Sequence, residues 1–283
     1  MIAFQIIISV ASVVLQSCLF NSLCKKTLKT NNKIYSFISV MYVVCIVLFA
    51  IGAVRGHFSV YTITLGVLFG VVTALGNLYK MRALASGPMH ITNLVTTSSM
   101  IIPAMSGIFF GEYFSIQKLI AVFVLIYFIY LSFGKTADAK ANQKWMIYCI
   151  LAALLQGSIG VLQKIHQSSA YKAEVNGFLL VAFICSFIYS RIMAGKPTEK
   201  TKFNVKLVIV AVICGICTYT MNVLNLRLSG LLPSQLFFPL VNGSTIVLNS
   251  IMSVVVFKES ISRKQFVGLC GGIVTLIAIC FIK

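Results

Sequence analysis

The sequence predicts an all-α polytopic membrane protein of ten transmembrane helices, arranged as two inverted five-helix repeats. Three observations predict this fold: a composition poor in charge, ten apolar runs, and a repeat between the two halves of the chain. Of the 283 residues, 59% are hydrophobic and 10% are charged, whereas a soluble domain of this size carries about 25% charged residues. Because so few charges cannot hydrate a soluble surface, we expect most of the outer surface to face lipid.

Each of the ten runs is long enough for a transmembrane helix, which needs about 20 mostly apolar residues. Strands of a membrane barrel alternate apolar and polar residues, but 123–131 and 208–213 are apolar at consecutive positions, so helices are expected. A polar stretch at 135–144 is interpreted as the linker between a first repeat, 1–134, and a second, 145–283. The runs are 3–23, 34–54, 60–79, 91–110, 117–134, 145–163, 174–191, 205–226, 236–257 and 265–282.

The repeat is visible as identities at constant spacing. Five residues near the end of the fourth run recur 147 positions later: Met105, Ser106, Phe110, Glu112 and Ser115 as Met252, Ser253, Phe257, Glu259 and Ser262. Leu15-Gln16 in the first run likewise corresponds to Leu155-Gln156 in the sixth. Since five helices are an odd number, the second unit must enter the membrane from the opposite side. Inverted repeats of this kind are typical of secondary transporters, with a binding site at the repeat interface near the midplane.

These features resemble the drug/metabolite transporter superfamily, EamA-like branch. The resemblance rests on the duplicated five-helix unit, on Ala83-Leu84 before Gly87-Pro88, and on two turns, 110–114 (Phe-Gly-Glu-Tyr-Phe) and 257–261 (Phe-Lys-Glu-Ser-Ile). It covers essentially the whole chain. It implies a transporter of small metabolites, since the family includes exporters of amino acids and other metabolites and some sugar importers.

Several other classes of function are disfavoured. The net charge of +18 could indicate nucleic-acid binding, but the basic residues sit in short clusters between apolar runs, as in membrane loops. Cys214 and Cys217 form a CxxC pair without a second pair or a nearby His, so we interpret them as packing residues. The sequence has no nucleophile elbow, phosphate loop or zinc-ligand cluster. We therefore expect no enzyme, no cofactor and no metal.

Uncharged polar residues inside the runs are the candidate substrate-binding groups. An amide in hydrocarbon must bond a neighbouring helix or line a wet cavity. Polar residues recur in the first, third and fourth helices of both halves, which favours a shared cavity. Lys80 could pair there with a substrate carboxylate or phosphate, the alternative being that it snorkels to the head groups. The candidates are Gln16, Asn77, Lys80, Asn93, Gln156, Asn222 and Asn242.

The five acidic residues all lie in loops or at the ends of runs. Export of a lipophilic cation by proton exchange relies on an intramembrane carboxylate, so we expect a neutral, zwitterionic or anionic solute. Glu112 and Glu259 are interpreted as structural, each fixing the short turn between the last two helices of its half.

Of the 23 Lys and Arg residues, 17 fall in the odd-numbered loops and six in the even-numbered loops and the C-terminus. This bias places the odd loops in the cytoplasm and both termini outside, whereas the resembled family is drawn with both termini inside.

The sequence thus predicts a multi-pass protein of the cell membrane (the cytoplasmic membrane in a bacterium), a secondary-active permease or exporter working by alternating access. The alternative is a non-transporting membrane receptor or assembly subunit. The expected partners are a small-molecule substrate and the lipid bilayer, with no nucleic acid, and a homodimer is left open.

Overall fold

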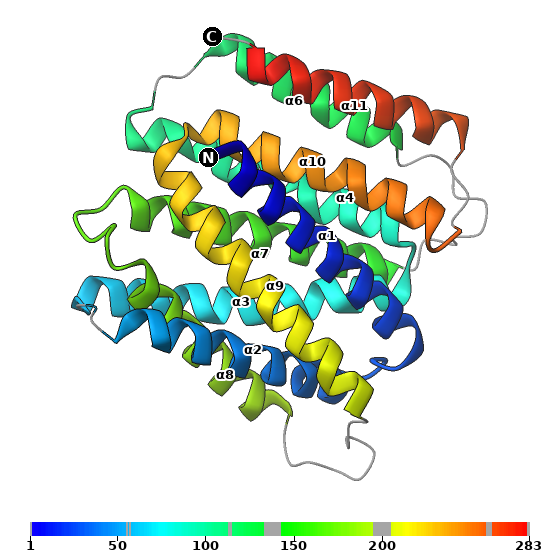
Figure 1. Cartoon of the computed structure of the whole chain (residues 1–283). Coiled ribbons are helices and arrows are strands. Elements are labelled where there is room, and N and C mark those ends of the chain that lie inside the picture. Colours follow the sequence, from blue (N-terminus) through cyan, green and yellow to red (C-terminus); the bar gives the residue numbers. More distant parts are fainter. Residues whose placement is uncertain are drawn as a thin grey trace.

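The computed structural model describes residues 2–54, 56, 58–112, 115–132, 143–194, 205–258 and 262–281, and these ranges contain helices and no strand. Figure 1 shows them as one bundle of mostly long helices. The helices are α1 (Ile2–Lys26), α2 (Asn31–Ala53), α3 (Val60–Ser86), α4 (Met89–Ser98), α5 (Ile101–Ser106), the 3-10 helix η1 (Gly107–Phe110), α6 (Ile116–Ser132), α7 (Gln143–Gln167), α8 (Val175–Ala194), α9 (Val205–Leu231), α10 (Ser234–Val255) and α11 (Arg263–Phe281).

Within the described ranges, eight segments are long and apolar enough to cross a membrane: α1, α2, α3, α7, α8, α9, α10 and the interrupted stretch Ile91–Phe110. α6 also contains an apolar segment, Leu119–Phe128. α6 packs against α11 along one side of the bundle (Figure 1). The chain is therefore an all-α polytopic membrane protein, in agreement with the coarse prediction.

The predicted run 91–110 is confirmed as a stretch long and apolar enough to cross a membrane, but its helix is interrupted and consists of α4, α5 and η1. Pro103 contributes to the break, since proline has no N–H to donate to the carbonyl of Ser99 four residues earlier. That carbonyl instead accepts the N–H of Ile102, three residues later, at 3.0 Å, which tightens the chain locally. Pro239, by contrast, lies inside a continuous α10.

Two residues of the predicted linker, Gln143 and Lys144, belong to α7. The rest of it, 135–142, and the loop 195–204 lie outside the described residues.

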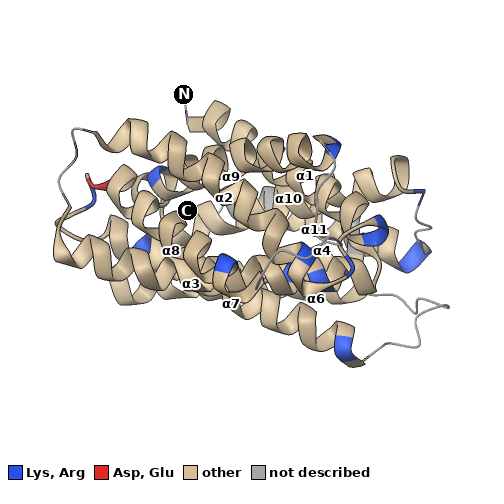
Figure 2. Cartoon of the chain, turned by 90° about the horizontal axis from the view of Figure 1, so that it is seen from below, with Lys and Arg blue, Asp and Glu red and all other residues tan. Residues whose placement is uncertain are grey.

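Basic residues gather at the end of the bundle that lies away from the two chain termini (Figure 2). Lys25 and Lys26 end α1, and Lys206, Arg263 and Lys264 lie in the first turns of their helices. We call this the basic end and the opposite one the terminal end.

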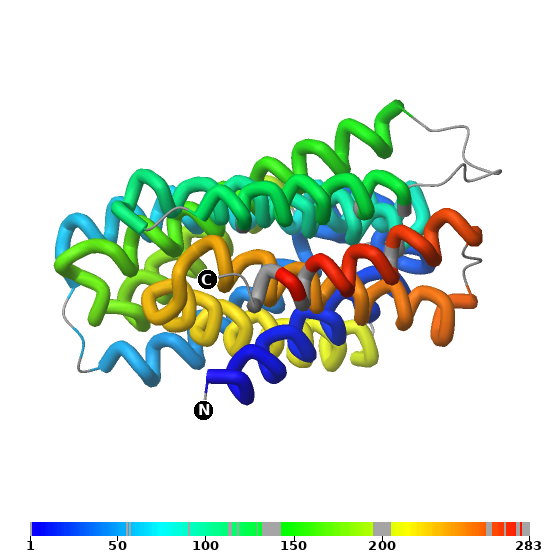
Figure 3. The backbone as a smooth tube through the Cα atoms, turned by 90° about the horizontal axis from the view of Figure 1, so that it is seen from above, coloured from blue at the N-terminus to red at the C-terminus, as the bar shows by residue number. Residues whose placement is uncertain are grey.

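The two predicted halves do not form separate lobes. The closest helix pairs join one half to the other: α1 with α9, α2 with α8 and α9, and α3 with α7 and α8. Figure 3 shows α1, in dark blue, lying against α9, in yellow. The main apolar core reflects this, with Phe49 of α2, Phe69 of α3 and Phe183 of α8 all fully buried in one cluster.

Small residues allow α3 and α8 to approach closely, as the Gly66-x3-Gly70 spacing suggests. A side chain at Gly70 would overlap the backbone carbonyl oxygen of Ala182 on α8. Ser186 of α8 also donates a hydrogen bond from Oγ to the Gly70 carbonyl at 2.8 Å. The two backbones are thus in direct contact in the middle of the bundle.

Candidate functional site

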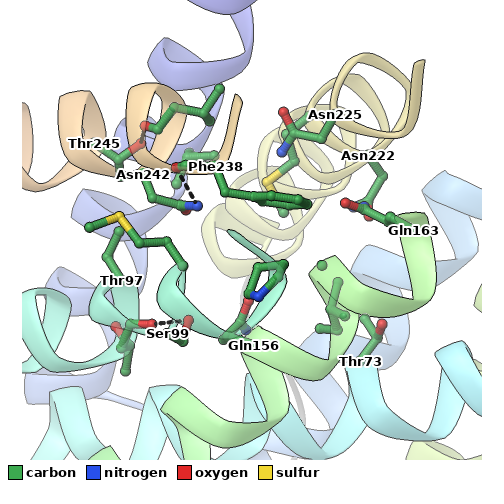
Figure 4. Close-up of a pocket in the computed structure, with 18 of the residues that line it drawn as sticks. Thr73, Thr97, Ser99, Gln156, Gln163, Asn222, Asn225, Phe238, Asn242 and Thr245 are labelled. Carbon is green, nitrogen blue, oxygen red and sulfur yellow. Dashed lines mark hydrogen bonds between the residues drawn. The ribbon is translucent and has the colours of Figure 1, made fainter. Parts of the chain in front are cut away.

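A cavity of about 120 Å³ lies between α1, α3, α4, α5, α7, α9 and α10. By volume it has room for on the order of ten water molecules or a small organic solute. Figure 4 shows amide and hydroxyl side chains converging on it from several helices. Its polar lining residues are Gln16, Thr73, Asn77, Lys80, Thr96, Thr97, Ser99, Gln156, Gln163, Thr218, Asn222, Asn225, Asn242 and Thr245.

Six of the seven candidate residues line this cavity: Gln16, Asn77, Lys80, Gln156, Asn222 and Asn242. They come from both halves of the chain, so the cavity lies between the halves. Asn93, the seventh candidate, does not line it.

The amides at matching positions in the two halves differ in their partners. Gln16 donates from Nε2 to Thr218 Oγ1 at 2.5 Å and to the Cys214 carbonyl at 3.3 Å, so it ties α1 to α9. Gln156 has no hydrogen-bond partner among the described residues, and it projects from α7 into the cavity (Figure 4). Gln16 therefore has a structural bond, and Gln156 is available to a bound molecule.

Two further amides keep an acceptor free. Asn222 donates from Nδ2 to the Thr218 carbonyl at 2.8 Å, and Asn242 donates to the Phe238 carbonyl at 3.0 Å. Each bond lies within one helix and holds the side-chain rotamer, so the amide oxygen remains to accept from a ligand. Asn77 instead donates to the Tyr42 hydroxyl on α2 at 2.9 Å.

The interrupted helix supplies another wall. Thr96, Thr97, Ser99, Met100 and Pro103 all line the cavity around the break between α4 and α5. The Ser99 hydroxyl donates back to the Thr96 carbonyl at 2.7 Å. Irregular backbone at membrane depth is tolerated where it lines a polar cavity, and this segment does so.

Sequence reasoning missed Thr73, Gln163 and Thr218, although a signal for them exists. Thr73 and Thr218 precede Asn77 and Asn222 by four residues, and Gln163 follows Gln156 by seven, so each shares a helix face with a predicted residue. All three line the cavity. Extending the predicted positions by whole helical turns would have found them.

Asn93 lies three residues before Thr96 on α4, one turn from the cavity toward the basic end. Its side chain is 1% exposed, and neither its Nδ2 nor its Oδ1 has a hydrogen-bond partner. Asn93 does not line the cavity because the lining on α4 begins one turn away, at Thr96. Periodicity along one helix does not reveal where neighbouring side chains close a space.

We expect Asn93→Leu to stabilise the protein by about 1 kcal/mol, because it removes an unpaired buried donor and acceptor. The matched control is Asn77→Leu, which leaves the buried Tyr42 hydroxyl without its partner and should destabilise by about 1–2 kcal/mol. Unfolding of the purified variants in one detergent measures both. A loss of stability in Asn93→Leu would contradict the expectation.

Next to the terminal end of the cavity lies an end latch, defined here as Glu112, Lys164, Ser229 and Ser234. Lys164 of α7 forms an ion pair with Glu112, and its Nζ donates to the Ser229 carbonyl at 2.9 Å. Ser234, the first residue of α10, donates its N–H to Glu112 Oε2 at 2.7 Å, and an anion at a helix N-terminus is favourable. Gln163, beside Lys164 in the sequence, and Phe237, one turn into α10, line the cavity.

The latch corrects the interpretation of Glu112. We expected its carboxylate to fix the turn between the last two helices of the first half. The carboxylate instead bonds Lys164 of α7 and Ser234 of α10, which belong to the other half. Gly111, with φ +68°, adopts the left-handed conformation that a glycine tolerates, and so turns the chain just before Glu112. Glu259, its counterpart in the repeat, lies outside the described residues.

Within the described ranges, no group of three or more His, Cys, Asp or Glu side chains could hold a metal ion. Cys214 and Cys217 are free thiols, both buried.

No family model matches the sequence, and no curated protein matches it. Among solved structures, 28 chains match. One of them, described only as the crystal structure of a protein, is similar over 99% of each chain with a TM-score of 0.67 and 15% sequence identity. At this identity the likeness shows a shared fold alone.

Proposed function

We propose that the chain is a secondary-active transporter, a permease or exporter, that moves a small polar organic metabolite across the cell membrane by alternating access. The observation that carries the proposal is the amide-lined cavity between the two halves of the chain. A cavity of this kind at the interface of two repeats is where secondary transporters bind their solutes.

The helix contacts favour ten spans in two inverted repeats. Exchanging the halves pairs α1 with α7, α2 with α8, α3 with α9, and α4 and α5 with α10. If the repeats are equivalent, the contact of α1 with α9 should have a counterpart between α7 and α3, and the contact of α2 with α9 should have one between α8 and α3. The structure contains all four contacts. The contact of α1 with α10 likewise becomes that of α7 with α4 and α5, which also occurs. α6 and α11, which pack on each other, would be the fifth helix of each repeat.

Reconstitution tests the proposal. Purified protein in proteoliposomes is expected to accelerate solute counterflow in a screen over amino acids, sugars, organic acids and organic phosphates. The control is Gly160→Leu, because a side chain at Gly160 of α7 would run into Pro103 and Phe238 and fill the cavity. If the wild type accelerates no solute beyond this variant, transport is the wrong function, and a receptor or assembly subunit takes its place.

Substitutions of Gln156 and Gln16 should have different effects, the first on solute binding and the second on stability. We expect Gln156→Leu to raise the KM for transport about tenfold while stability changes by less than about 0.5 kcal/mol, because no described bond is lost. Gln16→Leu removes the bonds to Thr218 and Cys214 and should cost about 1–3 kcal/mol of stability. Unfolding in detergent and counterflow give both quantities. Equal losses of stability in the two variants would contradict this assignment.

The charge bias predicts that the basic end faces the cytoplasm. Lys164 is one of the six basic residues outside the odd-numbered loops, and it is buried in the end latch. The difference in exposed positive charge between the two ends is therefore larger than the counts of 17 and six indicate. Asn32→Cys and Thr201→Cys should react with an impermeant thiol reagent only after the cells are permeabilised. Lys172→Cys, exposed at the terminal end, is the reciprocal control and should react in intact cells. Strong labelling of Asn32→Cys in intact cells would reverse the orientation.

A further inference from the structure

Lys80 reaches the cavity from the basic end of α3. Among the described residues that line the cavity, Lys80 carries the charge, and the other polar groups are amides and hydroxyls. Its Nζ donates to Ser17 Oγ on α1 at 3.3 Å, a long bond to a neutral acceptor. The side chain thus lies between α3 and α1 at the cavity, which argues against snorkelling toward the head groups.

Two other basic side chains, Lys164 and Arg82, have partners that stabilise their positive charge. Lys164 has the carboxylate of Glu112. Arg82, two residues after Lys80, donates to Asn31 Oδ1 at 2.5 Å and stacks over two tyrosine rings, with its guanidinium carbon 5.8 Å from the Tyr79 centroid and 5.2 Å from the Tyr148 centroid. Lys80 has no such partner among the described residues.

An ammonium group without a counter-charge is costly at membrane depth, and the cost falls if a bound molecule supplies the anion. Charge-assisted hydrogen bonds to a carboxylate or a phosphate are about twice as strong as neutral ones. The described cavity lining offers no carboxylate that could bind an ammonium group of the solute in turn. The described lining therefore provides a counter-charge for an anion and none for the ammonium group of a cation or a zwitterion.

Building on the proposed transport function, we infer that the solute is a small organic anion whose carboxylate or phosphate binds Lys80. A hydroxyl group of the solute donates to the amide oxygen of Asn222 or Asn242, and a carbonyl oxygen accepts from the free amide of Gln156. Lys80 is the residue that determines specificity for charge, and Ser17 positions its ammonium group.

Counterflow in proteoliposomes with four radiolabelled probes tests the inference: lactate, glycerol 3-phosphate, alanine and tetraethylammonium. The wild type is expected to carry lactate, glycerol 3-phosphate or both, which separates the carboxylate from the phosphate, and to carry the other two probes at least tenfold more slowly. Lys80→Met should raise the KM for the anion at least tenfold, and Lys80→Arg should restore most of the affinity. Arg82→Gln removes a neighbouring charge outside the cavity and should leave the KM unchanged.

If Lys80→Met does not fold, Lys80→Gln, which keeps a donor without the charge, is measured in its place. Faster transport of alanine or tetraethylammonium than of either anion, or anion transport with an unchanged KM in the Lys80 variants, overturns the inference while transport itself stands. Transport of none of the four probes also overturns the inference, whereas the proposed function falls only if the wider screen is negative too.

Discussion

Breaking the ion pair between Glu112 and Lys164 is expected to destabilise the protein by about 3–5 kcal/mol, the range for removing one partner of a buried pair. The two side chains are only 16% and 9% exposed, so a remaining charge would have little water to solvate it. Lys164→Met leaves the Glu112 carboxylate without its cation. Glu112→Gln keeps an oxygen that can accept the Ser234 N–H and removes only the charge. Denaturant or thermal unfolding in detergent measures the change.

The double variant, Glu112→Gln with Lys164→Met, is the internal control. Because it leaves no uncompensated charge, it should be more stable than either single variant. Lys172→Met, at an exposed position, should change stability by less than about 0.5 kcal/mol. Additive losses in the double variant would show that the two charges do not interact, and the latch would then be an incidental contact.

A side chain at Gly70 is expected to cost about 3 kcal/mol, because α3 and α8 must move apart to accommodate it. The Cβ atom of Gly70→Ala would overlap the Ala182 carbonyl oxygen, which belongs to a helix backbone and cannot rotate away. The displacement would also strain the hydrogen bond from Ser186 to the Gly70 carbonyl. The yield of folded protein and its unfolding midpoint measure the effect.

Gly272→Ala is the matched control for Gly70. It places the same atom on α11, where the nearest atom, on Leu125, would be 3.8 Å away, an ordinary contact. Replacing a helical glycine there should stabilise by up to about 1 kcal/mol through the higher helix propensity of alanine. If the two variants changed stability by the same amount, the close approach of α3 and α8 would not depend on the missing side chain at Gly70.

The sequence predicted much of the candidate site because polar residues are rare enough in apolar helices to stand out. Gln156, Asn222 and Asn242 were identified in this way, and all three line the cavity. Asn93 has the same amide side chain, but it lies one turn before the first cavity-lining residue of α4, Thr96. The difference between them depends on where α4 and its neighbours close the space, which no property of a single helix specifies.

The sequence by itself determined that the chain is helical and crosses a membrane. Apolar runs of this length exclude water, and a backbone without water must satisfy its N–H and C=O groups within each helix. This requirement is local, so each run could be identified independently of its neighbours. The missing N–H of proline does not by itself decide where a helix breaks, because the helix is interrupted near Pro103 but α10 runs on through Pro239.

Only the tertiary structure decided how the polar and charged groups are paired. Gln16 bonds Thr218 across 202 positions of the chain, while its counterpart Gln156 has no hydrogen-bond partner in the described part of the chain. Lys164 forms an ion pair with Glu112, whereas Lys80 lies at the cavity without an acidic partner among the described residues. The physical reason is that hydrogen bonds and ion pairs form between side chains within about 4 Å, and such neighbours come from different helices whose relative placement is set by the packing of the whole bundle.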